Sequence, residues 1–265
     1  MTIFSTENYK PSNNILPPLM TIYGTVGVGK STFASGFPKA FFFDFEGRTS
    51  HIANITRDSD YGIDLPKLSH WHQLINAARE LATTDFETIV FDGVTKLQNF
   101  VWEEVGRQLN NDNPRNIPYG QGYARAGELF ALLMHEAKEL QRNYKKTIIF
   151  IDHEKVKEED HGVANVQTFG KYFPECMNGV SKILLKESDY IFRLTEDISL
   201  IEDKKTGETR AIFNELVLHT DRKHNVESVL KSSLPLPIKI KANYNDFRNE
   251  YKAAYKKIHN NTTKG

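Results

Sequence analysis

The chain has 265 residues, of which 39% are hydrophobic and 26% are charged, a composition that excludes whole-chain disorder and supports a packed core. Its 34 Lys and Arg residues balance 34 Asp and Glu residues, which removes any global argument for a polyanion partner but leaves room for local basic patches. One cysteine, Cys176, excludes a disulfide framework, and no apolar run approaches the roughly 20 residues that span a bilayer. We therefore expect a cytoplasmic protein with no membrane partner.

The first part of the chain predicts alternating strands and helices, which is typical of a mostly parallel α/β sheet with right-handed crossovers. Residues 1–16 are polar and lack periodicity, so we expect a flexible N-terminal arm. Ser69 is the expected N-cap of a helix whose buried face carries Trp71, Leu74, Ile75, Ala78 and Leu81. The predicted strands cover residues 19–23, 39–45, 88–92 and 147–151, and the predicted helices cover residues 31–36, 69–85 and a segment around 126–140.

The pattern changes after residue 187, where short strands replace the strand–helix repeat and predict an antiparallel extension of the same sheet. The proline-rich residues 232–237 read as a connector. The last predicted element is a helix whose shared face carries Tyr244, Phe247, Tyr251, Tyr255 and Ile258. The expected organisation is an arm at 1–16, a core at 17–231 and a connector with a basic C-terminal helix at 232–265. The late strands are predicted at residues 189–195, 199–202 and 211–219, with a turn at 203–207.

The strongest chemical signal is the phosphate-loop pattern G-x-x-x-x-G-K-[ST], which lies between a predicted strand and a predicted helix. Its glycines let successive backbone N–H groups point at phosphate oxygens, and the helix N-terminus adds favourable potential. Lys30 is expected to reach the β- and γ-phosphates, and the Ser31 hydroxyl to bind Mg²⁺. A glycine-rich turn that matches by chance is the alternative. The predicted nucleotide-binding residues are Gly24, Thr25, Val26, Gly27, Val28, Gly29, Lys30, Ser31 and Thr32.

Two acidic residues at predicted strand ends complete a hydrolytic site. Asp92 ends a buried strand and is the candidate second contact for Mg²⁺, although a turn-capping Asp is the alternative. Strand alternation sends Asp44 and Glu46 to one side, and Glu46 is the candidate that orients the attacking water. A solvated carboxylate is the competing interpretation of Glu46.

With these pieces in order, the chain resembles a RecA-type ATPase core through GTVGVGKST, FFFDFEG, IVFDGVTKL and TIIFIDHEK. The resemblance implies ATP and Mg²⁺ as cofactors, a catalytic glutamate at Glu46 and a Walker B aspartate at Asp92. It also implies a γ-phosphate sensor at His153, where relatives usually have glutamine. A hydrogen-bonded structural histidine is the alternative for His153. The implied strand order, 5-1-4-3-2, places the strand of His153 beside the phosphate loop.

More closely, the chain is similar over about residues 18–225 to the phage-encoded RecA-like single-strand annealing proteins, a resemblance carried by PYGQGY at 118–123 and by His153-Glu154-Lys155. It implies a DNA-contacting loop at residues 154–170, self-association as a ring or filament, and a single-stranded-DNA-binding protein as a further partner. Arg222 matches the position of a basic residue that completes a neighbour's active site. A surface arginine is the alternative for Arg222.

The C-terminal segment adds a local basic surplus with interleaved tyrosines, a combination that suits phosphate contacts and base stacking. Alternatively, the aromatic face packs on the core while the lysines reach solvent. The leading hypothesis is an ATP- and Mg²⁺-dependent phage recombination protein that binds single-stranded DNA and hydrolyses ATP. A nucleotide-gated protein-interaction switch with slow turnover and a small-molecule kinase are the two alternatives.

Overall fold

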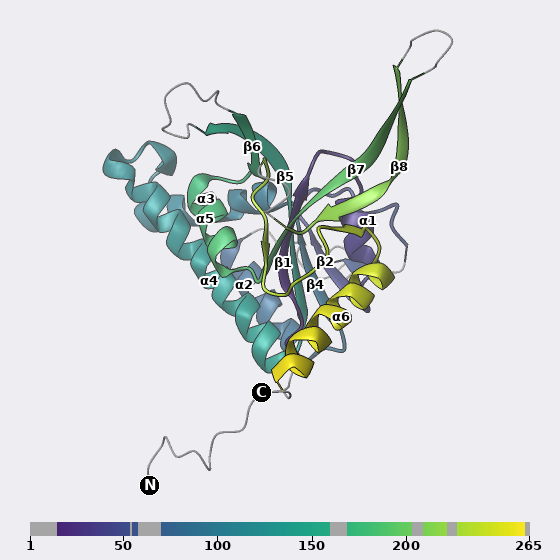
Figure 1. Cartoon of the computed structure of the whole chain (residues 1–265). Coiled ribbons are helices and arrows are strands. Elements are labelled where there is room, and N and C mark those ends of the chain that lie inside the picture. The colour runs from purple at the N-terminus through teal and green to yellow at the C-terminus, as the bar shows by residue number, and fades with distance from the viewer. Residues whose placement is uncertain are drawn as a thin grey trace.

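The computed structural model describes residues 15–53, 55–57, 70–159, 169–202, 209–221 and 227–262, and within these ranges it leaves out the side chains of residues 159, 169 and 259–262. A twisted sheet runs through the middle of the molecule, with helices on both of its faces (Figure 1). Its strands follow the order β10-β8-β7-β1-β5-β4-β2-β3. The predicted α/β fold with a mostly parallel central sheet and flanking helices is therefore confirmed.

The parallel part of the sheet has the strand order that a RecA-like core requires. β1 lies between β5 and β7 and pairs with both in parallel, and β4 and β2 follow β5 on the same side. The predicted antiparallel extension is formed by β8 and β10 beyond β7. The strands are β1 (Leu19–Gly24), β2 (Ala40–Asp44), β3 (Thr56–Arg57), β4 (Thr88–Asp92), β5 (Thr147–Glu159), β6 (Phe169–Pro174), β7 (Tyr190–Glu202), β8 (Thr209–His219), β9 (Lys231–Ser232) and β10 (Lys239–Lys241).

Two hydrophobic clusters cover the two faces of the sheet. Because side chains alternate along a strand, Phe41 and Phe43 of β2 join one cluster while Phe42 joins the other. A strand buried on both faces reads as a continuous apolar run, which explains the run of phenylalanines. The first cluster is covered by α2 (Trp71–Glu80), α3 (Val94–Leu109), α4 (Gln121–Tyr144) and α5 (Asn178–Glu187), and the second by α1 (Lys30–Ser35) and α6 (Tyr244–Thr262).

The C-terminal helix α6 packs against the core through its aromatic face. Phe247 is buried, and its ring lies 6.3 Å from that of Phe33 in α1 and 6.0 Å from that of Phe192 in β7. Tyr251 contacts the Tyr190 ring at 5.6 Å. The packed-face interpretation of these aromatic residues therefore holds, and the exposed residues Arg248, Lys252, Lys256 and Lys257 lie on the solvent side.

Several sequence-based boundaries were wrong. The segment after His153 is not a loop from its first residue, because β5 continues to Glu159 and pairs with β6. The two strands expected at 189–195 and 199–202 form one strand, β7, with a pairing irregularity at Asp197/Ile198. Helices α3 and α5 were not predicted, and His70 rather than Ser69 caps α2. Ser69, the arm up to residue 14 and the turn at 203–207 lie outside the described residues.

Within the described part of the chain, no helix is both long enough and apolar enough to cross a bilayer.

The PYGQGY motif forms the turn into α4, where Gly122 packs directly against the chain before it. A Cβ atom at Gly122 would lie 1.8 Å from the Pro114 carbonyl oxygen, so the Gly122→Ala variant must displace backbone. We expect it to lower the free energy of unfolding by about 1–3 kcal/mol in urea denaturation. Gly127 lies in the same helix with open space around it, so Gly127→Ala is expected to raise stability by about 0.5–1 kcal/mol. Equal effects of the two substitutions would contradict this packing.

Candidate nucleotide-binding site

The phosphate loop leaves the sheet at the end of β1 and enters α1. Gly24 has to be glycine because a Cβ atom there would lie 2.4 Å from the Leu194 carbonyl oxygen of β7. Gly27 and Gly29 have φ angles of +79° and +96°, a left-handed conformation that side chains disfavour. The sequence pattern is therefore required by the backbone path of the loop.

A cavity opens beside this loop at the carboxyl edge of the sheet. Of the predicted nucleotide-binding residues, Gly24, Thr25 and Val28 shape the loop without lining the cavity. The lining consists of Val26, Gly27, Gly29, Lys30, Ser31, Thr32, Glu46, Arg48, His51, Asp92, Gly93, Ile151, Asp152 and His153. The fold thus brings the predicted residues Lys30, Ser31, Glu46, Asp92 and His153 together.

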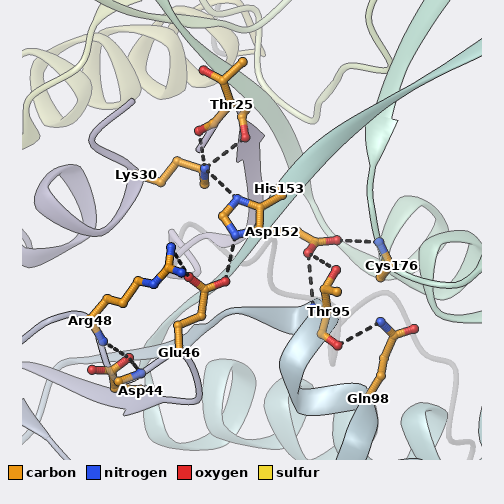
Figure 2. A network of polar contacts seen from close by, with 12 residues as sticks. Thr25, Lys30, Asp44, Glu46, Arg48, Thr95, Gln98, Asp152, His153 and Cys176 are labelled. Atoms are coloured by element: carbon orange, nitrogen blue, oxygen red, sulfur yellow. Dashed lines mark hydrogen bonds and ion pairs between the residues drawn. The ribbon is translucent and has the colours of Figure 1, made fainter. Parts of the chain in front are cut away.

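Lys30 is buried and points back along its own loop. Its Nζ donates to the carbonyl oxygens of Gly24 at 2.9 Å and Thr25 at 2.7 Å (Figure 2). Burial lowers the pKa of Lys30, and the nearby carboxylates of Asp92 and Glu46 oppose that effect. These contacts hold the ammonium group at the mouth of the loop.

His153 connects Lys30 to Glu46, as Figure 2 shows. Its Nδ1 lies 3.4 Å from Lys30 Nζ, and its Nε2 lies 2.8 Å from Glu46 Oε1. An ammonium group can only donate, so Nδ1 accepts and the proton resides on Nε2, which donates to the carboxylate. The imidazole therefore bonds to both side chains and couples the position of Glu46 to that of Lys30.

Glu46 and Asp44 have different surroundings, although the sequence placed them on one side. Asp44 accepts hydrogen bonds from the backbone N–H groups of Gly47 and Thr49, at 2.8 and 3.0 Å, and so caps its own turn. Glu46 instead packs over Gly93, where a Cβ atom would lie 2.6 Å from Glu46 Cγ. The glycine after Asp92 thus makes room for Glu46, a contact that sequence reasoning missed.

Asp92 ends β4 and lies buried beneath the phosphate loop. Burial raises the pKa of Asp92 to about 6, while a hydrogen bond from Ser31 acts in the opposite direction. The Ser31 hydroxyl and the Asp92 carboxylate are hard oxygen ligands side by side, a donor set that fits Mg²⁺, which takes few protein ligands and completes its shell with phosphates and water. Among the described residues, no group of three or more His, Cys, Asp or Glu side chains forms a metal site.

Asp152 is a further buried carboxylate that the sequence analysis did not single out. It accepts hydrogen bonds from the Thr95 hydroxyl and N–H at 2.8 and 3.2 Å, and from the Cys176 N–H at 2.8 Å. It thereby ties the start of α3 to the chain that follows β6 (Figure 2). An aspartate directly before His153 was the only available signal, because Thr95 and Cys176 are far away in sequence.

Arg222, the predicted residue for a neighbouring active site, lies outside the described residues.

A family model described as an AAA domain, AAA_24, matches residues 17–228. The chain belongs to this family. The match supports a P-loop NTPase, and the structure places the phosphate-loop sequence between β1 and α1. No curated protein matches the sequence.

Similar solved structures include a KaiC-like protein from the hyperthermophilic archaeon Pyrococcus horikoshii OT3, with 11% identity and a TM-score of 0.38, covering 75% of this chain and 80% of that one. The RadB recombinase is 12% identical with a TM-score of 0.38, covering 82% of this chain and 92% of that one.

Proposed function

We propose that the protein is an ATP- and Mg²⁺-dependent phage recombination protein that hydrolyses ATP, binds single-stranded DNA and promotes annealing or strand exchange as an oligomer. The observation that carries the hydrolytic part is the linked set Lys30–His153–Glu46 at the mouth of the phosphate loop. Its members come from α1, β5 and the turn after β2, and no smaller part of the fold would assemble them.

In the proposed reaction, the phosphate loop binds the triphosphate, and Lys30 exchanges its carbonyl partners for phosphate oxygens. Ser31 and Asp92 would hold Mg²⁺, which neutralises charge on the phosphates. Glu46 accepts a hydrogen bond, and so it is suited to orient the attacking water and take its proton. His153 keeps the Glu46 carboxylate facing Lys30 and responds when Lys30 moves.

The β5–β6 hairpin supports the DNA-binding part of the proposal. Lys157 and Lys171 place their ammonium groups 5.2 and 5.7 Å from the centre of the Phe173 ring. Lys171 is only 8% exposed, so Lys157 is the lysine placed to contact a phosphate, with the Phe173 ring beside it as a stacking surface. β5 carries both His153 and Lys157, so one continuous strand joins the nucleotide site to this hairpin.

ATPase activity measured with and without single-stranded DNA tests this function. We expect the oligonucleotide to raise kcat and the stimulation to weaken with salt. The Lys157→Gln variant should need more DNA for half-stimulation, and its salt slope should fall by about 1. Lys145→Gln is the matched control and should behave like the parent, because Lys145 is an exposed lysine at the end of α4, just before the opposite end of β5. ATP turnover that DNA does not stimulate at any salt concentration would favour the nucleotide-gated protein-interaction switch instead.

A further inference from the structure

The β7–β8 hairpin rises past the sheet edge above α1 (Figure 1). β1 ends at Gly24, where the chain turns into the phosphate loop, whereas its neighbour β7 continues to Glu202. Leu216 of β8 touches the loop, since its Cδ1 lies 3.2 Å from the position of a Cβ atom on Gly29. The base of the hairpin is therefore in contact with the predicted phosphate site.

The two faces of the hairpin differ in chemistry at its base, although the polar face also carries the exposed Ile201 and Ile212 further out. On one face, the Asn214 side chain donates to Asp197 and Ser199, and Lys239 also pairs with Asp197. The opposite face starts from the buried Leu194 and Leu218 of the second hydrophobic cluster, the cluster that contains α1. Alternation along β7 then places Ile198 and Leu200 on that α1-side face, with Phe213 paired opposite Ile198.

This α1-side face is apolar and open to solvent beyond Leu216. Ile198, Leu200 and Phe213 are 51%, 73% and 56% exposed. Glu196 of β7 pairs with Leu216 of β8, and Ile198 lies two residues further along β7. Ile198 is therefore about 7 Å beyond the level of Leu216 along the strand. An exposed apolar surface beside the phosphate loop is suited to contact a ligand that the loop holds.

The sheet order determines which part of a nucleotide would reach this face. Asp92 and His153 come from β4 and β5, and Glu46 comes from the turn after β2; these three strands all lie on one side of β1. A γ-phosphate placed among these side chains leaves the nucleoside to extend toward the other side of β1. That side is occupied by β7 and β8.

We infer that Ile198 and Phe213, on the α1-side face of the β7–β8 hairpin, form the surface that binds the nucleobase of the bound nucleotide. The inference rests on the proposed ATP binding by the phosphate loop. A planar heterocycle suits this surface because the Phe213 ring offers a stacking face and Ile198 supplies flanking apolar contact. The exposed Glu196 lies between this surface and the loop, at the level of Leu216, where its carboxylate can accept a hydrogen bond from a ribose hydroxyl.

Calorimetric titration with MgATP and with magnesium tripolyphosphate, which lacks the nucleoside, tests the inference. We expect the parent to bind MgATP more tightly than tripolyphosphate. Ile198→Ala and Phe213→Ala should each weaken MgATP binding by about fivefold to tenfold and leave tripolyphosphate binding unchanged. Ile201→Ala is the matched control, since Ile201 is 52% exposed on the opposite face of the same strand and should not matter for either ligand.

The outcomes separate this inference from the proposed function. If the parent binds neither ligand, the phosphate-loop function itself is wrong and the inference fails with it. If the parent binds both ligands equally, or if Ile198→Ala and Phe213→Ala keep full MgATP affinity, the loop binds phosphates but the proposed nucleobase-binding surface is wrong. Light scattering on the same variants adds a further check, because a change in oligomer mass at unchanged affinity would make this face a contact between copies of the chain.

Discussion

Replacing Glu46 by glutamine should lower kcat for ATP hydrolysis by about 10²–10⁴-fold while MgATP still binds. The substitution removes the group that can take a proton from water but preserves the size of the side chain. The glutamine amide oxygen can still accept the Nε2–H bond from His153, which spans 2.8 Å to the Glu46 carboxylate. Positioning of His153 is therefore retained, and the chemistry alone is removed. Single-turnover and steady-state assays, together with a nucleotide-binding titration, measure the two effects separately.

Glu87 provides the matched control for this prediction. Its carboxylate is 55% exposed, pairs with Lys39 at 3.5 Å and does not line the nucleotide cavity. We expect Glu87→Gln to keep kcat within about twofold of the parent, because an exposed ion pair contributes little. Parental turnover in Glu46→Gln would show that another group activates water, and Glu46 would then be a structural partner of His153.

Replacing Lys30 by alanine should weaken MgATP binding by about 10²-fold or more, because charge-assisted hydrogen bonds contribute about 1.5–3 kcal/mol each. Lys30 is 5% exposed and already sits at the loop mouth, held by the carbonyls of Gly24 and Thr25. Its charge is therefore positioned in advance for phosphate oxygens. The measurement is a nucleotide titration, with thermal unfolding alongside to confirm that the variant folds.

Two further variants sharpen the Lys30 result. Lys30→Arg keeps the charge but replaces a compact ammonium group with a larger, planar guanidinium group, so we expect this variant to bind MgATP poorly as well. Lys96→Ala removes an exposed charge close to the site, after Gly93, and should bind like the parent. Equal losses for Lys96→Ala and Lys30→Ala would mean that general positive potential, rather than a specific contact, holds the nucleotide.

Much of the central architecture was predictable because its signals are local. A strand buried on both faces has to be apolar throughout, so the phenylalanine run of β2 was recognisable. The phosphate loop requires a left-handed backbone at Gly27 and Gly29, so glycines occur there at a fixed spacing that can be recognised in the sequence. Helices α3 and α5 were not predicted although their signals are local too: buried residues recur at helical spacing, with Val94, Leu97 and Val101 in α3 and Val180 and Leu184 in α5.

The sequence by itself determined the phosphate loop, the order of the strand-end carboxylates and the mostly parallel sheet, because glycine conformation and apolar periodicity act over a few neighbouring residues. Tertiary structure alone decided that Asp44 caps its own turn, that Glu46 bonds to His153 across the sheet edge, and that Gly93 makes room for it. It also decided that one face of the β7–β8 hairpin meets the loop at Gly29. These contacts join residues far apart in the chain, and only the packing of several strands side by side brings them within reach of each other.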